Sequence, residues 1–371
     1  MADFADEDDV LLQAELKRFA AAVPEEELTT CTGRFVRVDF FRTLHKRLSL
    51  CIQFPTDYPL KEPLTVELKS PGATALAVAL VGKLNTLVDR RLDEHFRQKE
   101  EELERLRAEG KDVEGEANPH AVGQLLMITD FARSLVDNNR FLPCYDEVRA
   151  VRNMFAPEDI KCNERKGTLK MTMRQGMYFC HVTVTVPEEY PVKGVTIEMT
   201  KSNFVAYFAS VFLHTAREQV RKCVEPPLGK AMTPADSKPS LKMAVKYLNE
   251  ECVQRYAEER CADCKERMFP EDPRKQKPSA LSAASPDRII RLYCSHLYHL
   301  RCLESYMSRP PFKDGKGCLA PKCGKPVFHE AWKKDAKVAE KRWAMEQARL
   351  REIQDVEDEF ELEDRFLQRK G

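Results

Sequence analysis

The sequence predicts an α+β protein: two similar helix-and-sheet units in tandem, a small cysteine-rich module and a C-terminal helix. Three observations support this class. One arrangement of strands and prolines occurs twice, helical segments flank both copies, and six of the thirteen cysteines fall between Cys261 and Cys323. We expect the four parts to cover residues 1–138, 139–258, 259–330 and 331–371.

The repeated element consists of a strand, a proline, a Tyr-Pro pair and a second strand. Each copy opens with apolar side chains at every second position, which places one face of a strand in a core. These series are Leu48, Leu50, Ile52 and Phe54, then Cys180, Val182, Val184 and Val186. A proline ends each strand, because it has no backbone N–H to donate. In the first copy these features are Pro55, Tyr58-Pro59 and a second strand at residues 64–68. In the second copy they are Pro187, Tyr190-Pro191 and a second strand at residues 195–199.

Amphipathic helical segments flank each copy of this element. They cover residues 9–23, 75–96 and 121–138 around the first copy and residues 144–155, 203–224 and 240–260 around the second. A further strand precedes each copy, at residues 34–40 and 168–173. Residues 97–120 are dense in charge, and we expect a solvated helix extension that runs into a loop. Residues 225–240 predict a proline-rich loop.

This order of helix, antiparallel strands, Tyr-Pro loop and helices resembles the RWD domain, a relative of the ubiquitin-conjugating fold, over about residues 5–258. Residues 145–160, YDEVRAVRNMFAPEDI, are similar to the first helix of that family and the turn after it. Active conjugating enzymes place a nucleophilic cysteine just beyond the sheet, close to a His-Pro-Asn segment. Neither follows Leu68 or Met199. We therefore expect no catalytic residue here and interpret both units as binding modules.

Composition bounds the partners and the compartment. Lys+Arg and Asp+Glu both total 60, so no net charge attracts nucleic acid or an anionic membrane, and we expect neither as a direct partner. The acidic first ten residues lack the pattern of a signal peptide, and the cysteine count is odd, which favours a reducing compartment: cytoplasm, nucleus or both. We interpret the cysteines outside the cluster as small buried hydrophobic residues. They are Cys31, Cys51, Cys144, Cys162, Cys180, Cys223 and Cys252.

The cysteine cluster contains four pairs of potential metal ligands. The pairs are Cys261 and Cys264, Cys294 and His296, His299 and Cys302, and Cys318 and Cys323. Two ligands a few residues apart reach one ion from a single turn of backbone, and eight such ligands complete two closed tetrahedral sites. A catalytic zinc would keep one position open for water. We therefore expect two structural zinc ions as the cofactors.

The order C-x2-C, C-x-H, H-x2-C, C-x4-C resembles a RING finger. The resemblance implies that the pairs interleave, and it assigns the ligands to two sites. One site would contain Cys261, Cys264, His299 and Cys302, and the other Cys294, His296, Cys318 and Cys323. Zinc binding of roughly 10–16 kcal/mol would then contribute to folding. Another two-zinc fold and a degenerate RING that only scaffolds are the alternatives.

RING ligases bind a ubiquitin-charged conjugating enzyme and hold its thioester ready for attack. The positions that contact this enzyme in the family correspond here to Ala262, Leu303, Tyr306, Met307 and Pro321. Leu303 and Met307 have an alternative place in the core of the finger. Gly324 stands where many active RINGs carry an arginine, and Lys325 beside it offers a point charge in place of the planar guanidinium.

Two RWD-like units followed by a RING-like module resemble the architecture of RING ubiquitin ligases with RWD domains, as in the Fanconi anaemia core complex. The resemblance implies a RING-type ubiquitin ligase that binds a ubiquitin-conjugating enzyme and recruits a protein substrate through its RWD units. The alternative is a non-enzymatic scaffold or adaptor with a degenerate RING, since RWD pairs also serve as docking units in kinetochore and translational-control proteins.

Residues 332–367 predict a helix with two heptad rows of apolar residues. One row contains Trp332, Ala339, Ile353 and Phe360, and the other Ala336, Trp343 and Leu350. Glu346 interrupts the first row. We expect this apolar stripe to be buried in one of two ways. The helix packs back on the protein, or it pairs with a partner helix or a second copy of the chain.

Overall fold

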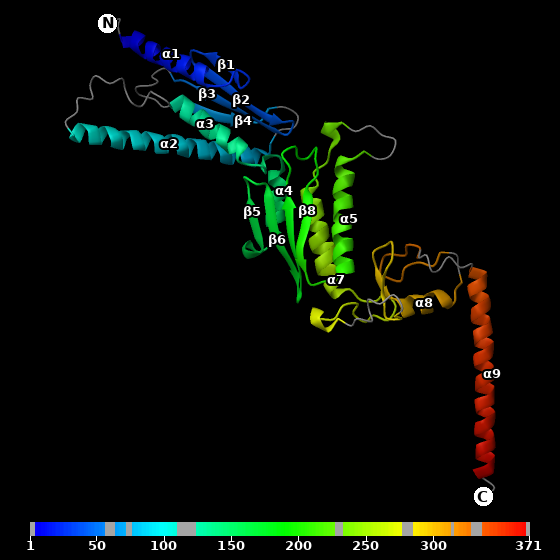
Figure 1. Ribbon diagram of the computed structural model, residues 1–371. Helices are drawn as coiled ribbons and strands as arrows, with labels where there is room; N and C mark the ends of the chain where they lie inside the picture. The colour runs from blue at the N-terminus through cyan, green and yellow to red at the C-terminus, as the bar shows by residue number, and fades with distance from the viewer. Residues whose placement is uncertain are drawn as a thin grey trace. The chain divides into compact units, whose positions relative to one another are not determined.

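The structure is a computed structural model that describes residues 4–55, 64–71, 76–109, 124–226, 233–276, 285–312, 315–327 and 336–368 (Figure 1). It contains antiparallel sheets and many helices, which confirms the α+β class. The chain divides into two compact units, Met1–Met173 with Cys180–Asn249 and Arg174–Phe179 with Glu250–Gly371. The four predicted domain boundaries are not tested by this division and stay predictions.

The first sheet has four antiparallel strands in chain order. They are β1 (Leu28–Thr32), β2 (Phe35–Thr43), β3 (Lys46–Gln53) and β4 (Thr65–Lys69). The inward series predicted for β3 is confirmed, because Leu48, Leu50 and Ile52 are fully buried and Phe54 nearly so. Each packs beside apolar partners across the sheet: Leu50, for example, lies opposite Val38.

Three helices complete this part of the first unit. They are α1 (Phe4–Ala22), α2 (Val78–Ala108) and α3 (Gln124–Asp137). Their apolar residues recur at helical spacing and join the strands in one buried cluster, as Leu80, Leu84 and Val88 do on α2. The helical part of the predicted charged extension is confirmed, since α2 continues to Ala108, whereas residues 110–120 of the predicted loop lie outside the described residues.

The second sheet repeats this plan. Its strands are β5 (Ile160–Asn163), β6 (Thr168–Gln175), β7 (Tyr178–Thr185) and β8 (Thr196–Ser202), again antiparallel in chain order. The helices are α4 (Tyr145–Arg152), α5 (Ala206–Val224), α6 (Leu241–Lys246) and α7 (Arg255–Glu258), and a π-helical segment, Tyr247–Gln254, joins the last two. Cys180, Val182, Val184 and Val186 are buried, so the second inward series is also confirmed.

The structure corrects several details. Strands β1 and β5 were not predicted, because both are short and polar and lie at an edge of their sheet. Helix α4 ends at Arg152 and not at Phe155, since Met154 donates to the carbonyl of Val151 in a tighter turn. The first Tyr-Pro pair, Tyr58-Pro59, lies outside the described residues.

The expectation of seven buried cysteines is wrong in part. Cys144, Cys180 and Cys252 are buried, whereas Cys51, Cys162 and Cys223 are half-buried and Cys31 is exposed. Cys31 belongs to the edge strand β1, whose side chains are at most half-buried. Cys51 alternates with Leu50 and Ile52 on β3 and therefore lies on the opposite face of the sheet.

The hydroxyl of Tyr190 holds the second Tyr-Pro loop in place. Tyr190 is fully buried; its hydroxyl donates to Glu147 Oε1 (2.6 Å) and accepts the backbone N–H groups of Ser240 (2.7 Å) and Leu241 (3.2 Å). Burial and the adjacent Glu147 carboxylate raise the pKa of Tyr190 above its ordinary value, so the hydroxyl keeps its proton. One side chain thus joins the loop after β7 to α4 and to the start of α6.

The predicted C-terminal helix is confirmed as α9 (Ala336–Gln368). Its side chains between Lys337 and Phe360 are exposed wherever they are described, apart from the half-buried Gln347, so most of the stripe there does not pack against the protein. The ring of Trp343 does lie 6.0 Å from that of Phe312. Trp332 is outside the described residues.

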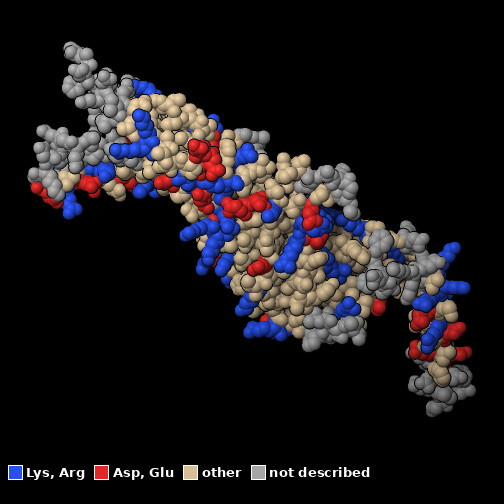
Figure 2. All heavy atoms as spheres, turned by 45° about the horizontal axis from the view of Figure 1, so that its top comes forward, with Lys and Arg blue, Asp and Glu red and all other residues tan. Residues whose placement is uncertain are grey.

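The surface agrees with the balanced composition, since Figure 2 shows basic and acidic residues interspersed over the face that it displays. Over the described ranges, none of the helices combines the length and apolar character needed to span a bilayer.

Replacing Tyr190 by phenylalanine is expected to lower the free energy of unfolding by about 2–4 kcal/mol, because two buried N–H groups and a carboxylate lose their partner. Urea denaturation of the full chain, followed by far-UV circular dichroism, measures the change. Tyr207→Phe is the matched control, since Tyr207 is 61% exposed. Equal stability of the Tyr190→Phe variant and the wild type would contradict this role.

Candidate metal centre

We call residues 260–327 the metal module. Its regular elements are β9 (Ile289–Arg291), β10 (Leu297–His299) and α8 (Leu300–Ser308). The two strands pair antiparallel, and the turn between them contains Cys294 and His296. The apolar core is small and includes Phe269, Leu297 and Leu303. The fold of this module therefore depends on more than its apolar contacts.

Tight backbone turns present the ligand pairs. Lys265, Ser295 and Lys322 have positive φ angles of 64°, 71° and 59°, each next to a ligand. The Lys265 N–H donates to the carbonyl of Cys261 (3.0 Å), which closes the first turn. At the last pair the chain doubles back so closely that a Cβ on Gly317 would lie 3.0 Å from the carbonyl oxygen of Gly324. These turns aim two ligands of a pair at one point.

The eight predicted ligands gather into two groups of four. One group contains Cys261, Cys264, His299 and Cys302, and the other Cys294, His296, Cys318 and Cys323. Within each group the donor atoms all lie within 4.8 Å of one another. The pairs interleave along the chain, as predicted, so each group joins segments that are distant in sequence.

The donor separations fit a tetrahedral metal ion. In the first group, His299 Nδ1 lies 3.4 Å from the Sγ atom of Cys264 and 3.8 Å from that of Cys302. In the second, His296 Nδ1 lies 3.6 Å from Cys318 Sγ. Metal–sulfur and metal–nitrogen bonds of about 2.3 and 2.0 Å at tetrahedral angles place S and N about 3.6 Å apart. Both groups can therefore hold a metal ion with all four positions filled.

The thiols within each group influence one another's ionisation. Burial, with the neighbouring Cys261 and Cys264, raises the pKa of Cys302 to about 12. Burial, with the neighbouring Cys318, raises that of Cys294 to about 11. Against its burial, hydrogen bonds from His299 and the backbone lower the pKa of Cys261 to about 6. Nearby thiolates repel one another, and a bound cation would favour the ionised form of each.

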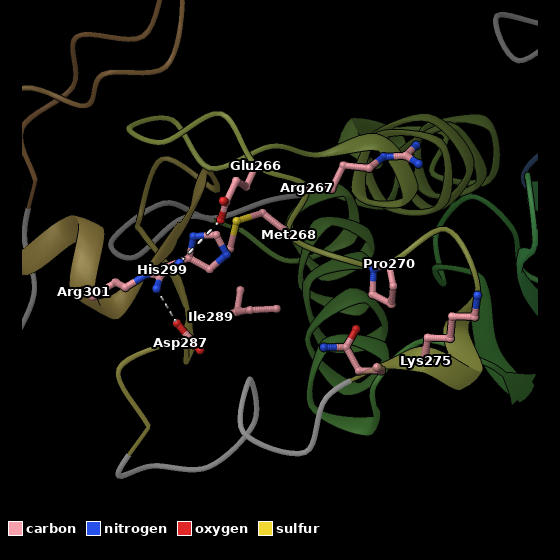
Figure 3. Close-up of a pocket in the computed structure, with 10 residues that line it drawn as sticks. Glu266, Arg267, Met268, Pro270, Lys275, Asp287, Ile289, His299 and Arg301 are labelled. Atoms are coloured by element: carbon pink, nitrogen blue, oxygen red, sulfur yellow. Dashed lines mark hydrogen bonds and ion pairs between the residues drawn. The ribbon is translucent and has the colours of Figure 1, made fainter.

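Side chains outside the two groups hold the ligands in place. The Arg301 guanidinium bridges two carboxylates, at 3.5 Å from Glu266 and 3.3 Å from Asp287 (Figure 3). His299 lies beside this bridge in the same view and lines a pocket of about 240 Å³ with Met268. The bridge joins the start of α8 to the first ligand turn and to the chain that leads into β9.

Two supporting side chains were missed by the sequence analysis. Tyr298 is fully buried beside the second group; its hydroxyl lies 3.2 Å from Cys318 Sγ and accepts the N–H of Leu319 (2.8 Å). Lys316 is 7% exposed and donates to the carbonyls of Tyr306 (2.7 Å) and Arg309 at the end of α8. A lysine in the last turn of a helix often caps its carbonyl groups, but Lys316 lies eight residues after the end of α8, so its position in the sequence gave no such signal.

The positions expected to bind a conjugating enzyme differ in exposure. Leu303 is fully buried and belongs to the core, which was its alternative assignment, because amphipathic α8 turns this face inward. Ala262 is only 7% exposed. Tyr306 and Met307 are half-buried, and the Tyr306 hydroxyl donates to the Gly317 carbonyl (2.7 Å).

Pro321 and Lys325 are exposed. Pro321 and Ala262, from the last and first ligand turns, line one hollow of about 480 Å³ together with Arg255 and Lys265. The structure thus brings these two predicted positions together, whereas Leu303, Tyr306, Met307 and Lys325 do not line this hollow.

Comparison with known proteins adds no assignment. Neither a protein-family model nor a curated protein sequence matches this chain. The interpretation of the site therefore rests on its donor atoms and their arrangement.

We expect the purified chain to contain two tightly bound metal ions, measurable by inductively coupled plasma mass spectrometry. His296→Ala should lose the ion of the second group and His299→Ala that of the first, because three donors leave a site open and weaker. Cys162→Ser is the matched control, since Cys162 lies outside both groups. Retention of two ions in both histidine variants would contradict the assignment.

Proposed function

We propose that this protein is a RING-type ubiquitin ligase whose two metal sites hold zinc. The observation that carries the proposal is the interleaving of the two Cys3His groups, which is the pattern implied by the RING resemblance. Thiolate and imidazole donors at tetrahedral spacing suit zinc among the common metals. With four protein donors in each site, zinc would supply structure and no open coordination position.

Zinc would be held by Cys261, Cys264, His299 and Cys302 in one site and by Cys294, His296, Cys318 and Cys323 in the other. Such a module contributes no nucleophile, and in a RING ligase catalysis is by positioning of the thioester carried by the bound enzyme. The proposed docking surface is built around the exposed Pro321 and the hollow that it shares with Ala262. Met307 and Tyr306 on α8, with Lys325, are the further proposed contacts.

The two tandem α+β parts are proposed to be RWD units that recruit the protein substrate. Their support is the repeated order of helices and four antiparallel strands, together with the Tyr190 loop. Exposed aromatic side chains, such as Phe41 on β2 and Tyr207 on α5, are available to a partner. Reduced thiols are required at both metal sites, which favours the cytoplasm or nucleus as the compartment.

A scaffold or adaptor without ligase activity is the second candidate, and specific residues favour it. Gly324, at a φ of 56°, stands where many active RINGs carry an arginine. Leu303 and Ala262 offer little surface to an enzyme, since both are buried. On this alternative the zinc module would be an assembly surface.

Ubiquitin transfer in vitro with a panel of conjugating enzymes separates the two candidates. A ligase should accelerate discharge of the charged enzyme, and Pro321→Ala should reduce the rate about tenfold, as expected for loss of about 1.4 kcal/mol at a central contact. Tyr293→Ala is the control, since Tyr293 is 82% exposed and does not line the hollow.

Zinc content shows that each variant is folded. The ligase proposal would be overturned, and the scaffold supported, if the protein with two ions bound neither binds any conjugating enzyme of the panel nor accelerates its discharge.

A further inference from the structure

Helix α9 carries its charges in two blocks. Between residues 336 and 351 the basic residues outnumber the acidic ones; they are Lys337, Lys341, Arg342, Arg349 and Arg351 against Glu340 and Glu346. Residues 352–364 contain acidic residues and no basic one; they are Glu352, Asp355, Glu357, Asp358, Glu359, Glu361, Glu363 and Asp364. The helix therefore has a basic first half and an acidic second half.

The same helix exposes large apolar side chains along one side. They are Val338, Trp343, Met345, Leu350, Ile353, Val356 and Phe360, and their exposed fractions range from 37% at Trp343 to 72% at Met345. At 100° per residue, these seven positions fall within an arc of roughly 160° around the helix axis. Singly exposed apolar residues are ordinary, but seven on one side of a helix mark an interaction surface, even with Arg342, Glu346 and Arg349 inside the same arc.

We propose that α9 pairs with α9 of a second copy of this chain in antiparallel orientation. The inference goes beyond the proposed ligase and does not depend on it. A parallel pair would align acidic half with acidic half and basic half with basic half, which is unfavourable. An antiparallel pair places each basic half against an acidic half, and its two-fold axis makes the interface self-complementary.

The positions along the helix support a definite register. With Leu350 opposite the partner's Ile353, the half-exposed Trp343 lies opposite the partner's Phe360, which is 68% exposed. In the same register Glu346 lies opposite the partner's Glu357, and Arg349 lies one helical turn from that glutamate.

Glu346 is the exception within the stripe of the basic half. It lies four residues after Arg342 and three before Arg349, at spacings that allow a salt bridge on the same helix. At 1.5 Å per residue the 33 residues of α9 span about 50 Å, more than four heptads, which is enough for a stable two-helix contact.

Sedimentation equilibrium of the full-length, metal-loaded chain tests the proposal. We expect a monomer–dimer equilibrium that weakens with added salt. Reversing the charge of two residues in the basic half (R342E/R349E) or in the acidic half (E357K/E363K) should raise the dissociation constant of the dimer at least about tenfold. The variant with all four changes should form the dimer again. The control K337E/R351E makes the same change of charge outside the apolar arc and should dimerise as the wild type does.

The following outcomes would overturn the proposed dimer or its orientation. A wild type that stays monomeric at all concentrations overturns the proposal, as does a control as strongly affected as R342E/R349E. A dimer that tolerates reversal of either half alone overturns the antiparallel orientation, because in a parallel pair like halves face each other before and after reversal. Far-UV circular dichroism and metal content verify that every variant is folded.

Discussion

The interleaving of two four-donor groups is the constraint on which the metal module depends. Its apolar core is too small to fix four separate ligand turns, yet each group brings together two pairs that are distant in sequence. Tyr298 lies on β10, which ends at His299 of the first group, and its hydroxyl contacts the thiol of Cys318 in the second group. His296 and His299 are three residues apart and belong to different groups, so the short segment between them links the two sites.

The two α+β parts are stabilised differently. There, alternation of apolar residues along β3 and β7 fills a core between sheet and helices. Buried polar side chains add hydrogen bonds and ion pairs to this apolar core. Tyr190 satisfies two backbone N–H groups at the start of α6, and Lys46, only 1% exposed, pairs with Glu188 at 2.6 Å. These buried polar groups are costly unless paired, so they specify one arrangement of their loops.

The α8 helix shows how structure restricts a functional interpretation. Leu303 and Tyr306 are neighbours on the helix, but Leu303 fills the core while Tyr306 uses its hydroxyl to hold Gly317. Lys316 returns from the following loop to the carbonyls at the helix end. Arg309 pairs with Asp263 of the first ligand turn at 2.6 Å, so both ends of α8 are tied to the ligands. A partner that docks on this helix would therefore meet a rigid surface.

The sequence alone determined the features that depend on local period and spacing. Alternation along a strand, helical spacing and short Cys/His pairs are encoded by near neighbours, so the inward faces of β3 and β7 and helix α9 were predicted correctly, and the eight Cys and His residues do gather in two groups that could hold metal ions. Only the tertiary structure decided the role of Leu303, the exposure of Cys31, the hydroxyl contacts of Tyr190 and Tyr298, and the capping by Lys316. Each of these depends on which distant segment approaches, and neither residue type nor spacing specifies that approach.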